Sequence, residues 1–131
     1  MTVRIVRLGS ARQQDEGLRI GTVRRPPRGV PKTEFASRDF YDVWYPQLSP
    51  VPELVQAAQT AQAAHDQRAW DTFVKQFRKQ MAEPDASRTL DLLAALSHQS
   101  NFSIGCYCED EAHCHRSVLR ALLTERGADV R

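Results

Sequence analysis

The sequence has 131 residues, of which 41% are hydrophobic and 26% charged, with a formal net charge of +2. This composition is typical of a soluble globular chain that can bury one hydrophobic core, so it excludes a disordered protein and predicts a single domain over residues 1–131. No apolar run approaches the roughly 18–20 residues that cross a bilayer, so we expect no membrane partner.

The first residues, MTVRIVRLGS, lack the apolar core of a secretory signal, so we expect a cytoplasmic protein. Thiols are normally kept reduced there, and the odd number of cysteines, three, also argues against a disulfide framework. The small net charge makes a nucleic-acid partner an unlikely expectation. No feature of the sequence predicts an oligomeric state.

Two strands are expected near the N-terminus. Val3–Leu8 alternates apolar and basic side chains, and Leu18–Val23 alternates again, as half-buried strands do. Gly21 in the second strand predicts a bulge or a close backbone approach. The polar segment Arg12–Gly17 between the strands is expected to be a loop.

A basic segment, Arg19–Lys32, contains five basic residues and no acidic one. Its RRPPRGVPK part has three prolines and a glycine, which excludes a regular helix and predicts a stiff loop. A stiff loop loses little entropy when it binds a phosphate or carboxylate, so Arg25 and Arg28 are candidate ligand-binding residues. A structural turn with solvated arginines is the alternative interpretation.

Helical patterns occupy the middle of the chain, after an aromatic cluster at Phe40–Pro46 that is expected in the core or in a pocket wall. Ser49 is a candidate cap for a helix that runs to about His65. Aromatic and aliphatic residues then recur at helical spacing from Trp70 to Met81. Pro84 is expected to end that second helix. A third helix is predicted to follow, capped by Ser87.

The last elements are a strand and a helix. Phe102–Cys108 is short and apolar, as a buried strand is, and Val118–Leu123 has helical periodicity with Gly127 as its stop. The predicted order is β-β-α-α-α-β-α. This order indicates a small α/β domain with a mostly parallel sheet and helices packed on it.

The stretch Phe102–Ser117, FSIGCYCEDEAHCHRS, holds all three cysteines and two of the four histidines. Its loop is expected at the carboxyl edge of the sheet, where α/β proteins bind ligands. Cys114 lies just before a predicted helix start, where free backbone N–H groups and the helix dipole attract anions and lower the pKa of a thiol. We therefore predict catalytic roles for Cys114 and His115. The predicted ligand-binding residues are Arg25, Arg28, Arg116, Cys106, Cys108 and Glu109.

Two other interpretations of the cysteines stay open. With His113 or His115, the three thiols could form a Cys3His zinc site. However, Cys106 and Cys108 on one strand place their sulfurs roughly 7 Å apart, wider than the thiolates of one zinc ion. We therefore assign no metal ligand and keep zinc only as a possible cofactor. The cysteines could also be purely structural, as small buried side chains.

Four segments in order resemble a known family: GLRIGTVRRPPRGVPK, YDVWYPQLSPVPEL, Trp70-x2-Phe73 and CYCEDEAHCHRSVL. Together they resemble the bacterial domain-of-unknown-function 488 family, the YeaO-like proteins, over about residues 18–123. Many members carry C-x-E or C-x-C before a Cys-His-Arg triplet, and Cys106-Tyr107-Cys108 matches the second form. Pro26 stands where some relatives carry Trp. The resemblance implies a small cytoplasmic α/β protein and no particular activity.

The residues therefore predict a site for a small anion, phosphate or nucleotide-like, at the Cys-His-Arg loop, either for binding or for catalysis. The loop is not the C-x5-R loop of cysteine phosphatases, because Cys114 stands six residues after Cys108, and Arg120 six after Cys114. The alternative function is a non-enzymatic binding module, either zinc-stabilised or accessory to nucleic acid.

Overall fold

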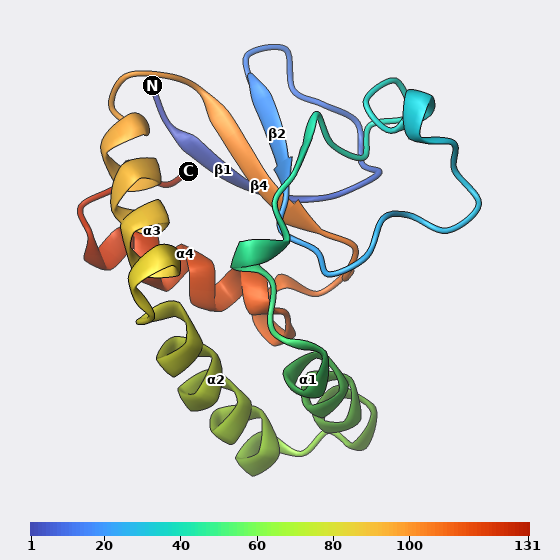
Figure 1. Ribbon diagram of the computed structural model, residues 1–131, viewed down its shortest axis with the longest axis vertical. Coiled ribbons are helices and arrows are strands. Elements are labelled where there is room, and N and C mark those ends of the chain that lie inside the picture. Colours follow the sequence, from blue (N-terminus) through green and yellow to red (C-terminus); the bar gives the residue numbers. More distant parts are fainter.

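The computed structural model describes residues 1–131, and its strands form one four-stranded sheet in the order β1-β4-β2-β3 (Figure 1). The strands are β1 (Val3–Arg7), β2 (Leu18–Gly21), β3 (Val43–Trp44) and β4 (Phe102–Cys106). Every neighbouring pair is parallel. The α/β class and the parallel sheet are therefore confirmed, and the aromatic cluster adds a short third strand that was not predicted.

Four α-helices accompany the sheet: α1 (Pro52–Ala64), α2 (Gln67–Met81), α3 (Pro84–Leu96) and α4 (His115–Glu125). In Figure 1, α1 and α2 form a hairpin that projects away from the sheet, whereas α3 and α4 lie beside it. His65 ends α1 in the left-handed conformation, with φ of 50°. Asp66 then caps α2 by accepting the Ala69 N–H at 3.0 Å. None of these helices is both long and apolar enough to cross a membrane.

The two predicted serine caps are wrong, and proline explains both. Helix α1 begins at Pro52 and α3 at Pro84, because the fixed φ of proline fits the first helical position, where its missing N–H has no partner to lose. Ser49 is instead buried before α1, and its carbonyl accepts hydrogen bonds from Arg24 and Gln80. Ser87 lies inside the first turn of α3.

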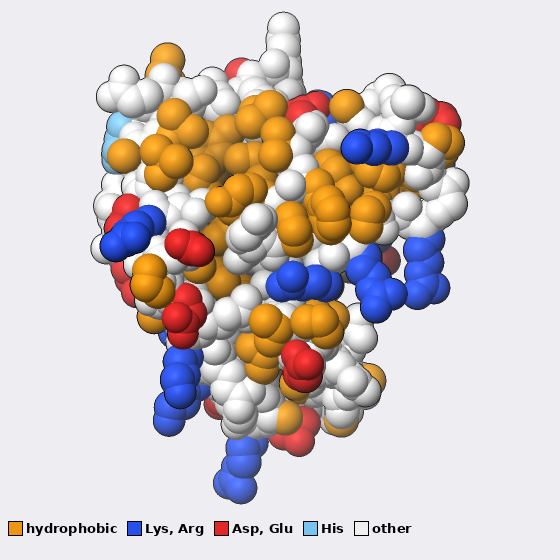
Figure 2. Space-filling view, viewed as in Figure 1, with side chains coloured by type: hydrophobic (Ala, Val, Ile, Leu, Met, Phe, Trp, Pro, Cys, Tyr) orange, Lys and Arg blue, Asp and Glu red, His pale blue; other side chains and the backbone are white.

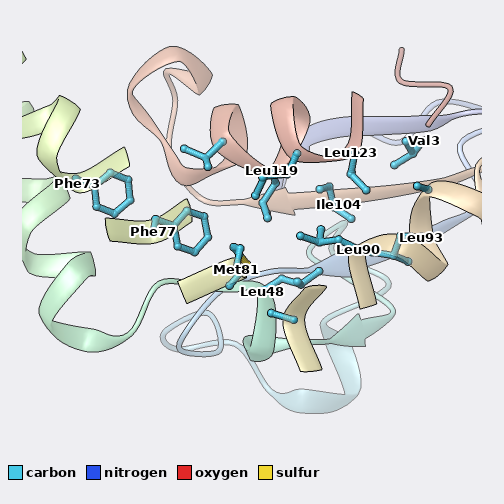
Figure 3. Packing of buried hydrophobic residues seen from close by; sticks show 14 of the residues in the cluster. Val3, Leu48, Phe73, Phe77, Met81, Leu90, Leu93, Ile104, Leu119 and Leu123 are labelled. Atoms are coloured by element: carbon cyan, nitrogen blue, oxygen red, sulfur yellow. The ribbon is translucent and has the colours of Figure 1, made fainter. Parts of the chain in front are cut away.

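The main core is a cluster of 17 buried residues between the sheet and helices α2, α3 and α4 (Figure 3). Phe73, Phe77 and Met81 form the buried stripe of α2, as their spacing predicted. Strand β4 is buried at every residue because strands flank it on both sides. This burial fixes the end of β4, from which the cysteine stretch departs.

A second, smaller cluster lies where the strands end: Leu8, Val23, Tyr41, Cys106 and Cys114. Gly21 lies there against an aromatic side chain, not against the bulge or close backbone expected from the sequence, because a Cβ atom at this position would overlap the Tyr41 ring. The chain can therefore fold the Tyr41 ring directly onto the sheet. The same cluster contains two of the three cysteines, Cys106 and Cys114.

Arg19 does not belong with the exposed basic residues that follow it. Its side chain is fully buried, and its Nε and Nη2 donate to the Glu16 carboxylate at 2.7 and 2.9 Å. The Ser103 hydroxyl donates to the same carboxylate at 2.7 Å. Since a buried charge requires a partner, this pair ties the loop after β1 to strands β2 and β4.

Candidate functional site

A pocket of about 870 Å³ opens at the carboxyl end of the sheet. Its floor contains all three thiols and the imidazole of the cysteine stretch: Cys106, Cys108, Cys114 and His115. One wall is the α1 surface between Pro52 and Gln62, and another is the loop that follows β2. The volume suits a small molecule, and parallel sheets place their ligands at this edge.

Arg25 and Arg28 line this pocket together with the thiols. Both side chains are exposed, and neither guanidinium takes part in a hydrogen bond or ion pair within the chain. Arg24 differs, because its guanidinium is held by the carbonyls of Ser49 and Pro50. Figure 2 shows Lys and Arg side chains in a row at the level of this loop. The two free arginines are therefore available to an anion in the pocket.

The thiols of Cys106 and Cys114 meet at the base of the pocket, with their sulfurs 2.7 Å apart. Both residues are buried, at 2% and 1% exposure, whereas Cys108 is half-buried and the most accessible of the three. The backbone N–H of Cys108 donates to the Cys106 sulfur at 3.4 Å. The loop thus folds back and brings residues from the end of β4 and the start of α4 into contact.

The three thiols perturb one another's ionisation. Hydrogen bonding with Cys108 and Cys114 raises the pKa of Cys106. The pKa of Cys108 is lowered to about 3, mainly by hydrogen bonding with Cys106, next by hydrogen bonding with Cys114, and also by the charge of Arg116. The pKa of Cys114 is also lowered, first by the hydrogen bond with Cys106 and further by His115. These shifts favour an ionised thiol within the cluster, with neighbouring S–H groups as its donors.

His115 is held in one orientation. Its Nε2 atom lies 2.7 Å from the Thr22 carbonyl oxygen, and the edge of its ring packs against Phe77. Because a carbonyl only accepts hydrogen bonds, Nε2 carries the proton in the neutral ring. The lone pair is then on Nδ1, which lies 3.8 Å from the Cys114 sulfur. His115 can therefore accept the proton of Cys114.

Arg116 is buried behind the thiols and does not line the pocket. Its Nη2 donates to the Cys108 carbonyl at 2.7 Å, and its Nε donates to the Cys114 sulfur at 3.5 Å. This arrangement supports the loop and stabilises negative charge on sulfur. Arg25 and Arg28 line the pocket, whereas Arg116 does not.

Glu109 and His113 lie outside the main pocket. Glu109 is exposed, 3.5 Å from Arg7, and lines a neighbouring cavity of about 610 Å³ together with His113. The His113 ring is paired with Asp110 at 2.9 Å and packs edge-on against Trp70. The structure therefore does not bring Glu109 together with the predicted anion-binding arginines.

A metal ion has a different possible ligand set from the predicted one. The ligand atoms of Cys106, Cys114 and His115 all lie within 4.8 Å of one another. The spacing along one strand describes only Cys106 and Cys108, whereas the loop returns Cys114 to the side of Cys106. Two soft thiolates and an imidazole are compatible with zinc, and His113 is not part of this set.

Thr22 and Phe40 are site residues that the sequence reasoning missed. Thr22 directly follows β2, and its N–H and hydroxyl both bond to the Gly105 carbonyl, at 2.9 and 3.0 Å. Its position at the end of a strand next to β4 was a usable signal, since parallel strands end at one edge. Phe40 lines the pocket, but only its membership of an aromatic cluster marked it.

Comparison with known proteins supports the family resemblance. The model described as the active DUF488-N3 subclade matches residues 3–127. No curated protein and no solved structure gives a significant match to the chain. The matched range covers both walls of the pocket and the whole cysteine stretch. The chain therefore belongs to the domain-of-unknown-function 488 family, within its DUF488-N3a group.

Proposed function

We propose that the pocket binds a small anionic molecule, such as a phosphate ester or a nucleotide, and that Cys114 attacks it with His115 as the proton acceptor. The observation that carries this proposal is the orientation of His115. The Thr22 carbonyl at 2.7 Å fixes the proton on Nε2, so the basic Nδ1 faces the Cys114 sulfur. A thiol beside an oriented base is the usual arrangement of a nucleophilic cysteine.

The charges around the pocket favour an anion. Arg25 and Arg28 have no acidic partner within the chain, and guanidinium groups bind phosphate and carboxylate through paired N–H donors. Cys114 is the N-cap residue of α4 and also lines the pocket, so the positive end of the helix dipole is directed to the same place. Two separate sources of positive potential therefore flank the reactive thiol.

The chemical step is a displacement at the electrophilic atom of the bound molecule. Cys114 gives its proton to Nδ1 of His115, and its sulfur forms a bond to that atom. The bond to the leaving group breaks, and the leaving group takes the electron pair. The His115 imidazolium then donates its Nδ1 proton to the leaving group, so the charge of the pair is restored.

Site-resolved alkylation with iodoacetamide tests this proposal. We expect Cys114 or its neighbour Cys108 to react faster at neutral pH than an ordinary thiol, because the pKa of each is lowered. Inorganic phosphate and AMP, the two probes, should slow this reaction by occupying the pocket. Equal and slow labelling of all three cysteines, unchanged by either probe, would contradict the proposal.

A zinc-stabilised binding module is the second candidate, and the close grouping of Cys106, Cys114 and His115 favours it. Elemental analysis of protein purified without added metal decides between the zinc-stabilised module and the anion site with a nucleophilic Cys114. Stoichiometric zinc, together with a lower melting temperature after chelation, would support the module, because structural zinc contributes directly to folding. Substoichiometric zinc with an unchanged melting temperature would exclude the zinc-stabilised module.

A further inference from the structure

The contact between Cys106 and Cys114 is closer than ordinary packing. Their sulfurs are 2.7 Å apart, well inside the roughly 3.5–4.0 Å at which non-bonded carbon atoms attract most strongly, although sulfur is the larger atom. The two residues are eight positions apart in sequence. The fold therefore places two thiols in a position where a bond between them needs little movement.

Both thiols are held by well-anchored elements. Cys106 is the last residue of β4, which is buried throughout and paired with β1 and β2. Cys114 is the N-cap of α4, whose Leu119 and Leu123 lie in the main core. Because both ends are fixed by the core, bringing the sulfurs together costs little further conformational entropy.

We propose that Cys106 is a resolving thiol for Cys114, so that the protein forms a reversible Cys106–Cys114 disulfide when Cys114 meets hydrogen peroxide at the base of the pocket. This activity needs no bound anion and is separate from the proposed displacement reaction. It assigns a chemical role to Cys106, which is buried and which that reaction does not use.

The reaction runs in two steps. The Cys114 thiolate, whose proton has passed to His115, attacks one peroxide oxygen, so the O–O bond breaks and hydroxide leaves; Cys114 becomes a sulfenic acid. The Cys106 sulfur then attacks the Cys114 sulfur, an S–S bond forms, the S–O bond breaks and water leaves with the Cys106 proton. The hydroxide takes the proton held by His115. Two thiols and one peroxide give one disulfide and two waters.

Cys108 is the competing partner because it interacts with both other thiols, but the sulfur–sulfur contact at 2.7 Å joins Cys106 and Cys114. Cys108 is half-buried at the pocket surface and is not in the group whose ligand atoms lie within 4.8 Å of one another. Its backbone N–H donates to the Cys106 sulfur, which helps to hold that sulfur beside Cys114. Cys108 therefore positions the pair, and its own thiol should stay free.

The test is peptide mapping of the metal-free protein after brief treatment with hydrogen peroxide and alkylation of the remaining thiols. All three cysteines lie between Arg88 and Arg116, so trypsin alone cannot separate them. Cleavage after Tyr107 separates Cys106 from Cys108, and cleavage after Glu109 or Glu111 separates Cys108 from Cys114. The same oxidation in urea is the control, because the unfolded chain should give a mixture of pairings.

The expected result is a single Cys106–Cys114 link in the folded protein, with Cys108 alkylated and the link removed by dithiothreitol. The variant Cys108→Ser should form the same link, whereas Cys106→Ala should leave Cys114 to oxidise further to the sulfinic acid. A Cys108–Cys114 link in the folded protein would overturn the proposal. Sulfinic acid at Cys114 beside an alkylated Cys106, or no oxidation, would also overturn it. None of these results depends on anion binding, so they are independent of the proposed function.

Discussion

The Nε2 atom of His115 lies 2.7 Å from the carbonyl oxygen of Thr22, a residue 93 positions earlier in the chain. Since β2 and β4 are parallel neighbours, Thr22 at the end of one strand reaches the helix start that follows the other. The main chain of one segment therefore selects the tautomer of a side chain in another. The proposed role of His115 as the proton acceptor of Cys114 rests on this contact.

Replacing His115 with Gln should slow alkylation of Cys114. The hydrogen bond between Cys114 and Cys106 has the largest effect on the pKa of Cys114 and lowers it. The contact with His115 lowers this pKa further, so loss of the imidazole moves it upward. Each unit of increase above the working pH reduces the thiolate fraction about tenfold. Iodoacetamide rates measured from pH 5 to 10 check the shift. His98→Gln is the matched control, because His98 is exposed and its ring hydrogen-bonds with the Gly127 carbonyl. The same shift of the Cys114 pKa in both variants would contradict the pairing of Cys114 with His115.

The double variant Arg25→Ala, Arg28→Ala should lose protection of the thiols by phosphate or AMP. A hydrogen bond to a charged group contributes about 1.5–3 kcal/mol, so each arginine should change the apparent affinity about tenfold or more. Protection curves at two salt concentrations give these affinities. The control is Lys75→Ala, Arg88→Ala, which removes the same charge from exposed positions outside the pocket. Equal loss in both variants would indicate a general charge effect.

The fold was largely predictable because its signals are local. The stripe from Trp70 to Met81 and the apolar run of β4 each identify an element by periodicity or composition alone. The predicted caps at Ser49 and Ser87 failed because proline competes with serine at a helix start, and the sequence pattern does not rank the two.

The site was less predictable because it depends on contacts distant in sequence. The spacing of Cys106 and Cys108 could be judged along one strand, but the return of Cys114 to Cys106 depends on the path of the loop. In the same way, Arg19 and Arg25 look alike in a basic segment. Only the packing of Glu16 shows that Arg19 is buried and paired, whereas Arg25 is free.

Glu16→Gln should destabilise the protein by about 3–5 kcal/mol, because it leaves the Arg19 guanidinium buried without its counter-charge. Urea unfolding measures the change in the free energy of unfolding. The exposed Glu53→Gln is the control and should stay within about 0.5 kcal/mol of the unchanged protein. A similar small effect at Glu16 would show that the pair contributes little.

Acid should weaken the same pair. Burial tends to raise the pKa of Glu16, but hydrogen bonds from Arg19 and Ser103 outweigh it, so the folded-state pKa is below the ordinary 4.5. A lowered carboxyl pKa stabilises the folded state above the unfolded-state value, and that contribution is lost as pH falls below about 4.5 through the folded-state pKa. Urea titrations from pH 7 to pH 3 should show this loss. If the free energy of unfolding of Glu16→Gln falls equally steeply with pH, the loss of stability in acid does not come from Glu16.

Tyr41→Phe should leave the stability unchanged or raise it. The Tyr41 hydroxyl is the one buried side-chain nitrogen or oxygen without a hydrogen-bond partner, and a buried polar group without a partner costs about 1–3 kcal/mol. The ring itself packs on Gly21 and meets Phe35 edge-on, with ring centres 5.2 Å apart, and both contacts survive in phenylalanine. Thermal and urea unfolding of the two proteins make the comparison.

Tyr45→Phe is the matched control, because the Tyr45 hydroxyl lies 3.0 Å from the Thr89 hydroxyl. That variant loses this hydrogen bond, so its free energy of unfolding should fall by about 1 kcal/mol.

Burial raises the pKa of Tyr41 above its ordinary value of 10.0, so the folded state is favoured below pH 10 and loses that advantage as pH rises further. Tyr41→Phe should therefore show a smaller fall in stability between pH 9 and pH 11 than either the unchanged protein or Tyr45→Phe. A loss of stability at neutral pH in Tyr41→Phe would mean that the hydroxyl has a partner, such as a buried water, that stabilises the fold.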